Sequence, residues 1–142
     1  MKVAIGADHG GYNYKEELIK YIEGLGYQTE DFGTYDNNSC DYPIFAQKVA
    51  SSVVDGNCER GILICGTGIG MAIAANKYKG IRAALCSDLF SAKATREHND
   101  SNILCLGARV IDLQLAKDIT SIWLNTPFSG EERHVRRIKM IE

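Results

Sequence analysis

The sequence from residue 62 to residue 70 reads Ile62-Leu63-Ile64-Cys65-Gly66-Thr67-Gly68-Ile69-Gly70. It opens with apolar residues that do not alternate with polar ones, which is typical of a strand in a parallel sheet covered on both faces. Alternating glycines follow, and a helix is expected to begin near Ile69 or Gly70. A buried strand that passes through a glycine turn into a helix predicts the α/β class.

The same alternation of short apolar runs and helical stretches extends along the whole chain. Further strands are expected at residues 3–5, 27–32, 81–85 and 103–106, and further helices at about 11–25, after Asp41, after Asp88, from Asp112 to Pro127 and at about 131–141. Each of these aspartates is expected to cap the helix that follows it. Right-handed crossovers between the strands predict a single domain over residues 1–142, a Rossmann-like three-layer α/β/α sandwich around a five-stranded parallel sheet.

The composition excludes several classes of protein. The 142 residues are 45% hydrophobic and 24% charged, and the net charge of −2 does not fit a basic nucleic-acid-binding protein. No apolar run approaches the ~18 residues of a membrane span, and the N-terminal residues lack the pattern of a signal peptide. The five cysteines lack Cys-x-x-Cys spacing, and the three histidines lack the spacing of metal ligands. We therefore expect a cytoplasmic protein that needs no disulfide, metal or cofactor and binds neither nucleic acid nor membrane.

The glycine loop after Cys65 presents several backbone amides at the start of a helix. Such amides attract a phosphate or an oxyanion, and they are expected to lower the pKa of the Cys65 thiol. Familiar phosphate loops do not fit, because Met71 stands where a dinucleotide fingerprint needs glycine or a phosphatase loop needs arginine, and no lysine serves a nucleotide loop. A glycine loop that carries a cysteine and the hydroxyl of Thr67 remains. Taken alone, Cys65 fits a small buried core residue better than a reactive one, and the attached glycine loop weakens that interpretation.

Other polar residues follow the strands or lie near the end of the chain. Ligands of parallel α/β sheets bind beyond the carboxyl ends of the strands, so residues in those places are candidates for a site. Plainer interpretations are a helix-capping aspartate, surface histidines and a solvated charged helix. The candidates are Asp8 and His9 before Gly10-Gly11, His98 at the end of a helix, Arg109 after the last strand, and Arg133 and Arg137 on one face of the last helix.

Taken together, these motifs match a known family. In order, they are Ala7-Asp8-His9-Gly10-Gly11, Asp41-Tyr42-Pro43, Cys65-Gly66-Thr67-Gly68-Ile69-Gly70, Glu97-His98-Asn99, Gly107-Ala108-Arg109 and Arg133-His134. This ordered set covers nearly the whole chain and resembles the type B ribose-5-phosphate isomerases. Their family also includes galactose-6-phosphate isomerase.

The resemblance implies a role for each matching residue. Cys65 resembles the general base that carries a proton between C1 and C2 of the sugar, and Thr67 resembles the residue that helps to move the hydroxyl proton. The remaining roles are an enediolate cradle at the amides of Gly66, Thr67, Gly68, Ile69 and Gly70, ring binding and opening at Asp8 and His98, substrate contacts at Tyr42 and Asn99, and phosphate binding at His9, Arg109, Arg133 and Arg137. The family uses no metal or cofactor. It forms dimers or dimers of dimers with shared sites, so the helix at about 131–141 is expected at a subunit interface.

The activity implied by the resemblance is interconversion of ribose 5-phosphate and ribulose 5-phosphate through an enediolate. Some relatives use a glutamate in the loop as base, but neither Ile69 nor Met71 offers a competing carboxylate here. Glu131-Glu132 stand where many relatives have glycines. Allose 6-phosphate and galactose 6-phosphate are alternative substrates, although His98 favours a pentose phosphate. Two other classes stay open: an enzyme with a cysteine nucleophile, and a non-catalytic module that binds a phosphosugar.

Overall fold

The computed structural model describes residues 1–142 and contains one five-stranded sheet in which every neighbouring pair of strands is parallel. The strands are β1 (Lys2–Ala7), β2 (Gln28–Asp31), β3 (Arg60–Cys65), β4 (Ala83–Leu85) and β5 (Ile103–Gly107). Their order across the sheet is β2-β1-β3-β5-β4. The chain builds outward from β1 in one direction with β2 and in the other with β3, so the topological switch point lies between β1 and β3.

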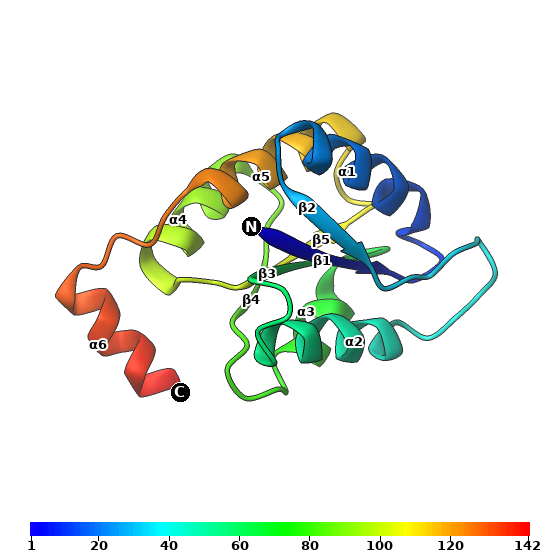
Figure 1. Ribbon diagram of the computed structural model, residues 1–142. Helices are drawn as coiled ribbons and strands as arrows, with labels where there is room; N and C mark the ends of the chain where they lie inside the picture. The colour runs from blue at the N-terminus through cyan, green and yellow to red at the C-terminus, as the bar shows by residue number, and fades with distance from the viewer.

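Helices cover both faces of the sheet, which confirms the three-layer α/β/α architecture (Figure 1). One face is covered by α1 (Tyr12–Gly24), α4 (Leu89–Asn99) and α5 (Leu113–Asn125), and the other by α2 (Tyr42–Val54) and α3 (Ile69–Ala75). The first layer buries Leu18, Ile22 and Trp123 against the sheet, and the second buries Phe45 and Met71. Burial on both faces explains why the strands are continuously apolar.

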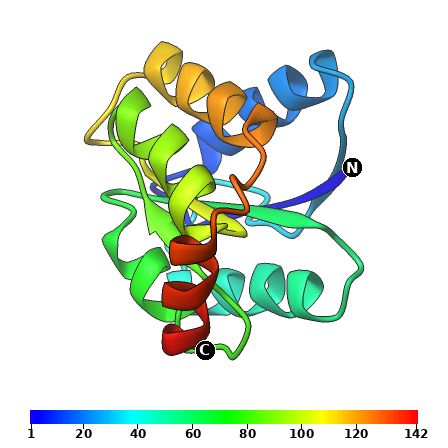
Figure 2. The same cartoon turned by 90° about the vertical axis from the view of Figure 1, so that its left-hand side faces the viewer.

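The last helix, α6 (Glu132–Ile141), stands apart from this sandwich. In Figure 1 it lies at the left, beyond the end of α4, and Figure 2 looks onto the same edge with α6 in front. His134 is the one residue of α6 that is buried. The helix therefore leaves most of its surface to solvent in a single chain.

Two local expectations were wrong. The fourth strand begins at Ala83 rather than at residue 81, because the Asn102 side chain accepts the amide proton of Arg82 at 2.8 Å and strand pairing starts only at Ala83 opposite Ile103. Asp41 occupies the residue before α2, but its carboxylate accepts no hydrogen bond from the helix.

The other two caps are confirmed. The Asp88 carboxylate accepts from the Ser91 amide at 2.7 Å, and the Asp112 carboxylate accepts from the Leu115 amide at 2.8 Å. These bonds satisfy amides in the first turns of α4 and α5 that have no partner within the helix.

Candidate functional site

The carboxyl ends of β1, β3 and β5 bring three of the predicted motifs together. Ala7 pairs with Ile64 and Cys65 pairs with Gly107, so the residues after each strand leave the sheet at the same level. Backbone bonds continue beyond the strands, with the Arg109 amide donating to the Gly66 carbonyl at 2.9 Å. This edge faces right in Figure 1, where the arrows of β1 and β2 point.

Cys65 is the last residue of β3, and its side chain lies just beneath the glycine loop. The residue is 5% exposed, and the Gly68 amide donates a hydrogen bond to its Sγ at 3.1 Å. The exposed Thr67 hydroxyl accepts from the Ile69 amide at 3.2 Å, which leaves its own proton free to donate. The loop therefore holds a thiol and a free hydroxyl donor side by side.

The glycines of the loop are required by close neighbours. Gly68 has φ of +79°, and a Cβ there would lie 2.5 Å from Leu85 Cδ1. A Cβ on Gly66 would lie 3.1 Å from Arg109 Nη1, and a Cβ on Gly70 would lie 2.6 Å from the Tyr42 ring. Arg109 and Tyr42 thus pack directly against the loop.

Asp8 and His9 approach this loop from the end of β1. The Asp8 carboxylate accepts hydrogen bonds from the Gly10 amide at 2.9 Å and the Gly11 amide at 3.2 Å, which fixes the turn into α1. A Cβ on Gly10 would lie 3.3 Å from the Gly66 amide nitrogen, so the two turns are in contact. The Asp8 side chain is therefore held next to the cysteine loop.

A backbone contact that the sequence did not predict orients His9. The Cys40 amide donates to His9 Nδ1 at 3.2 Å. Because an amide is always a donor, Nδ1 is the acceptor and the proton of the neutral ring lies on Nε2. No sequence motif predicts this bond, because it depends on the path of the segment between β2 and α2.

The remaining predicted residues lie at the opposite edge of the sheet, where the strands have their amino ends; we call it the amino edge. His98 and Asn99 end α4, and the Asn99 carbonyl accepts from Arg82 Nε at 2.9 Å just before β4 begins. Arg133 and Arg137 belong to α6, which stands beyond the same edge (Figure 2). One chain therefore does not bring these four residues to Cys65.

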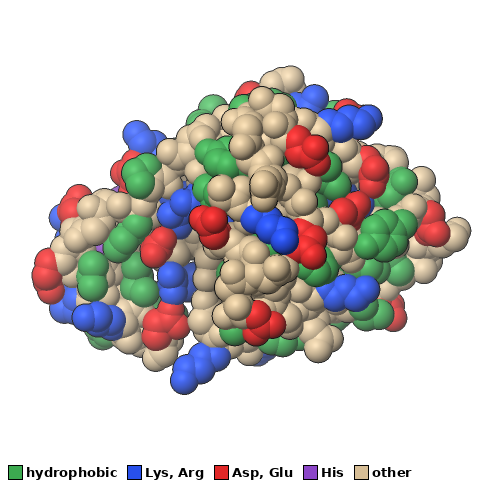
Figure 3. Space-filling view, in the orientation of Figure 1, with side chains coloured by type: hydrophobic (Ala, Val, Ile, Leu, Met, Phe, Trp, Pro, Cys, Tyr) green, Lys and Arg blue, Asp and Glu red, His purple; other side chains and the backbone are tan.

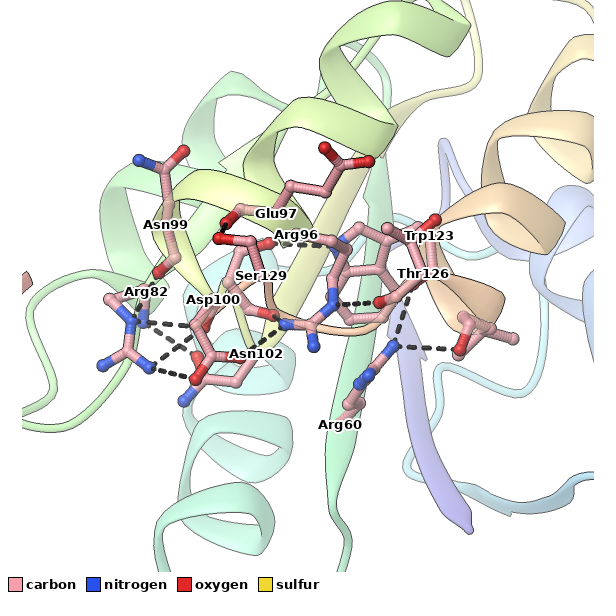
Figure 4. Close-up of polar contacts among 12 residues, drawn as sticks. Arg60, Arg82, Arg96, Glu97, Asn99, Asp100, Asn102, Trp123, Thr126 and Ser129 are labelled. Atoms are coloured by element: carbon pink, nitrogen blue, oxygen red, sulfur yellow. Dashed lines mark hydrogen bonds and ion pairs between the residues drawn. The ribbon is translucent and has the colours of Figure 1, made fainter. Parts of the chain in front are cut away.

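This second edge is held by a network around Arg96, a residue that sequence reasoning did not single out. Arg96 is 4% exposed and donates to the Ser101 carbonyl at 2.6 Å, to the Thr126 carbonyl at 3.0 Å and to an Asp100 carboxylate oxygen at 2.8 Å. Figure 4 shows its guanidinium between the end of α4 and the segment that leads to α6. The Ser129 amide and hydroxyl both donate to the Glu97 carbonyl, at 3.3 and 2.8 Å.

The residues of α6 make unequal contacts. Arg133 pairs with Glu131, whereas Arg137 forms no ion pair. The ring of His134 stacks on that of His98 with centroids 4.5 Å apart. Burial, and then the charge of Arg133 and the nearby His98, hold the pKa of His134 below its usual value.

The largest cavity also lies at this edge and not beside Cys65. It has a volume of about 560 Å³ and is bounded by the turn before β4, the end of α4 and the C-terminal end of α6. Figure 3 shows it as a gap between α6 and the body of the molecule, bordered by charged side chains. At the glycine loop there is a smaller hollow of about 140 Å³ whose walls include Thr67, Leu85 and Val110.

No three His, Cys, Asp or Glu side chains gather where they could hold a metal ion. None of the helices has the length and the apolar content needed to cross a bilayer. All five cysteines are free thiols.

A parallel α/β sheet with a cysteine-bearing glycine loop at its switch point defines a protein of the doubly wound class, whose ligand sites lie at that point. A family model described as Ribose/Galactose Isomerase matches residues 3–141, and the chain belongs to this family. This confirms the resemblance that the sequence motifs indicated.

Individual relatives are similar over nearly their full length. The Bacillus subtilis protein YwlF is 55% identical over 142 residues, which cover 99% of this chain and 95% of that protein. Ribose-5-phosphate isomerase B of Escherichia coli is 45% identical over 99% of this chain and 93% of the relative. The solved structure of ribose-5-phosphate isomerase B from Clostridium thermocellum superposes with a TM-score of 0.97 at 54% identity, covering 99% and 95% of the two chains.

Proposed function

We propose that the protein interconverts ribose 5-phosphate and ribulose 5-phosphate through an enediolate, with Cys65 as the general base. Relatives similar over nearly the whole chain are named for ribose 5-phosphate isomerisation. The observation that carries the proposal is the position of the Cys65 sulfur, which accepts the Gly68 amide proton at 3.1 Å inside a loop at the switch point of the sheet. A base is needed there because isomerisation removes a weakly acidic proton from carbon.

The loop also offers what the enediolate requires. Negative charge develops on the oxygens of C1 and C2 as the proton leaves, and amides already aimed at that position stabilise it without reorganisation. In this proposal the amides of Gly66, Thr67 and Gly70 receive that charge, because the Gly68 amide already donates to Cys65 Sγ and the Ile69 amide to the Thr67 hydroxyl. The free proton of the Thr67 hydroxyl then passes to and from the sugar oxygens.

Two groups at the same edge fit the substrate phosphate. His9 presents an Nε2 proton because the Cys40 amide occupies Nδ1, and Arg109 places its guanidinium against Gly66. Neutral imidazole and guanidinium groups both donate to phosphate oxygens. Binding a phosphate remote from C1 and C2 holds the reacting carbons near the thiol.

We further propose that the site is shared between two copies of the chain. The carboxyl edge holds Cys65 and Asp8, whereas His98, Asn99, Arg133 and Arg137 lie at the opposite edge of the same chain. A homodimer, alone or within a dimer of dimers, would bring the second group to the partner's Cys65. The exposed apolar residues Ile69, Leu85 and Val110 beside the loop are 51%, 42% and 60% exposed and favour such an association.

In this arrangement residues 1–142 act as one domain, α6 lies at the subunit interface, and His98 with Asp8 opens the sugar ring. The proposed enzyme works in the cytoplasm without metal or cofactor. Full activity after exhaustive chelation is the expected result, and recovery of lost activity by a divalent metal would contradict it.

The test compares kcat/KM for ribose 5-phosphate, allose 6-phosphate and galactose 6-phosphate in the presence of a chelator. The largest value is expected for ribose 5-phosphate, because His98 favours a pentose phosphate. Running the reaction in D2O should place deuterium on the carbon that receives the proton, which a hydride shift would not do. Binding without turnover would indicate a phosphosugar-binding module, and a covalent phospho- or acyl-enzyme detected by mass spectrometry would indicate a cysteine nucleophile.

A further inference from the structure

The two histidines at the amino edge of the sheet form a stacked pair. The rings of His98 on α4 and His134 on α6 lie with centroids 4.5 Å apart and planes inclined by only 19°. His98 is exposed, whereas His134 is 6% exposed. The pair thus consists of one ring that a ligand can reach and one ring that lies behind it.

The buried ring contributes its face and not its nitrogen. The Nε2 atom of His134 is buried without a hydrogen-bond partner, which is unfavourable for a polar group and rare in folded proteins. Within one chain no hydrogen bond to Nε2 accounts for the position of His134, and the contact that its ring does make is the stack under His98.

The surroundings favour the uncharged form of this lower ring. Burial lowers the pKa of His134, and Arg133 and His98 lower it further, while Glu131 acts in the opposite direction and Arg137 in the same one. A neutral ring can lie under His98 in either protonation state, since a protonated imidazole is attracted to the face of a neutral aromatic ring. Lys93 and Glu97 on α4 pair with each other at 3.5 Å.

We infer that His134 is a positioning residue whose ring fixes the plane of His98 so that the edge nitrogens of His98 point at the sugar ring. This inference rests on the proposed function, which assigns His98 to ring opening. Stacking uses only the face of His98 and leaves both of its nitrogens free to give and take protons. A side chain on the last turn of α4 would otherwise rotate freely, and proton transfer needs the donor within hydrogen-bond reach of the ring oxygen.

Two substitutions test the contribution of the His134 ring separately from that of its nitrogens. His134→Phe keeps a flat ring under His98 and removes the unpaired nitrogen, so it is expected to fold at least as stably as the native protein. His134→Leu fills a similar space without a ring. Val135→Ala, next to His134 on α6 and partly buried, serves as a control for general loosening of the helix.

The first measurement reads the stack without any turnover. The chain has three histidines, so the Hε1 proton of His98 can be assigned by NMR from its absence in His98→Asn. Ring-current shielding by the partner ring should move this signal upfield in the native protein and in His134→Phe. In His134→Leu the signal should return toward that of a free histidine, and an unchanged signal would overturn the inference.

The second measurement reads its consequence for the reaction. Ribose 5-phosphate is mostly a closed ring, whereas ribulose 5-phosphate is acyclic because its O5 is esterified, so release of its C1 proton into D2O needs no ring opening. His134→Leu should lower kcat on ribose 5-phosphate by about tenfold, with KM and the exchange rate nearly unchanged. His134→Phe and Val135→Ala should keep most of the native kcat.

Three results would overturn the inference. They are equal loss in His134→Phe and His134→Leu, equal loss of isomerisation and exchange, or a rise in KM alone, which would assign Nε2 to substrate binding. If His98→Asn itself turns over the cyclic sugar normally, the ring-opening role in the proposed function fails, while the NMR signal still decides whether His134 holds the ring of His98.

Discussion

Cys65 is one of five thiols, and its surroundings differ from those of Cys58, Cys86 and Cys105. Burial raises the pKa of Cys86 to about 11 and also raises that of Cys58 and Cys105, so these three remain uncharged thiols at neutral pH. Cys65 instead lies under the loop with an amide directed at its sulfur. We therefore propose the proton-transfer role for Cys65 rather than for Cys58, Cys86 or Cys105.

Replacing Cys65 by alanine is expected to lower kcat by at least ~100-fold, which is the usual scale for removal of a general base. KM should change little, because the base acts mainly in the transition state. Steady-state kinetics with isothermal titration of substrate check both statements. Cys58→Ala, at another buried thiol, is the matched control and should keep its kcat; a Cys65→Ala protein that does so as well would remove Cys65 from the mechanism.

Arg133 and Arg137 of α6 should contribute unequally to phosphate binding. Arg133 already pairs with Glu131, whereas Arg137 has no competing carboxylate. Arg137→Ala is expected to raise KM more than Arg133→Ala. The rise should correspond to a loss of binding free energy of at most ~1.5–3 kcal/mol, the contribution of a hydrogen bond to a charged group. Glu131→Gln frees Arg133 and should lower KM. The same KM in both arginine variants, or no effect of Glu131→Gln, would speak against this unequal division.

At the scale of elements, Arg96 ties the end of α4 to the segment before α6. Arg96→Met removes hydrogen bonds to two carbonyls and a carboxylate, and should lower the free energy of unfolding by about 3 kcal/mol. Arg136, whose pairing with Glu132 lies on the surface of α6, is the control, and Arg136→Met should cost only ~0.3–0.5 kcal/mol. Urea denaturation of both proteins measures the difference; equal midpoints would show that the network adds little.

The docking of α6 on α4 should weaken as the pH falls. The pKa of His134 is lower in the folded protein than in the unfolded chain, so between these two values the unfolded chain binds more protons and stability rises with pH. Stability from this group is thus present above its usual pKa and decreases below it. Limited proteolysis after residue 125 should accelerate from pH 7.5 to about pH 5.5.

The control for this effect is His134→Phe, which cannot titrate at that position. Its proteolysis rate should vary much less over the same interval, after correction for the protease's own pH profile. An identical pH dependence in both proteins would assign the effect to other groups.

Most elements could be predicted from the sequence, because apolar runs such as residues 62–65 and caps such as Asp88 act locally. The fourth strand was placed too early because Ile81 is buried in a turn, and burial alone does not distinguish a turn from a strand. At the site, the motifs after β1, β3 and β5 were predictable from topology. The Cys40 contact to His9 and the stack of His98 on His134 were not, since both join segments far apart in the chain.

At the scale of the whole molecule, the division of the candidate residues between two edges can be tested by mixing inactive proteins. Cys65→Ala and Arg137→Ala proteins are each expected to be nearly inactive at low substrate concentration. After subunit exchange, a hybrid dimer contains one site with both residues intact. Random mixing should then restore about a quarter of the native activity, since half of the dimers are hybrids with one of two sites intact.

Native mass spectrometry of differently tagged subunits verifies that the subunits have exchanged. A mixture of Cys65→Ala with Cys65→Ser is the control and should recover nothing. Verified hybrids without activity would assign Arg137 to the site of its own chain or to no site.

Because Cys65 and His98 lie at opposite edges of the sheet, the activity per molecule should also depend on protein concentration. If the site is shared as proposed, a chain that meets no partner holds the base without the ring-opening group, so output per molecule follows the fraction of chains that are associated. Below the dissociation constant that output scales with the square of the amount synthesised. A cell that halves the expression of this protein would then lose three-quarters of the flux it carries.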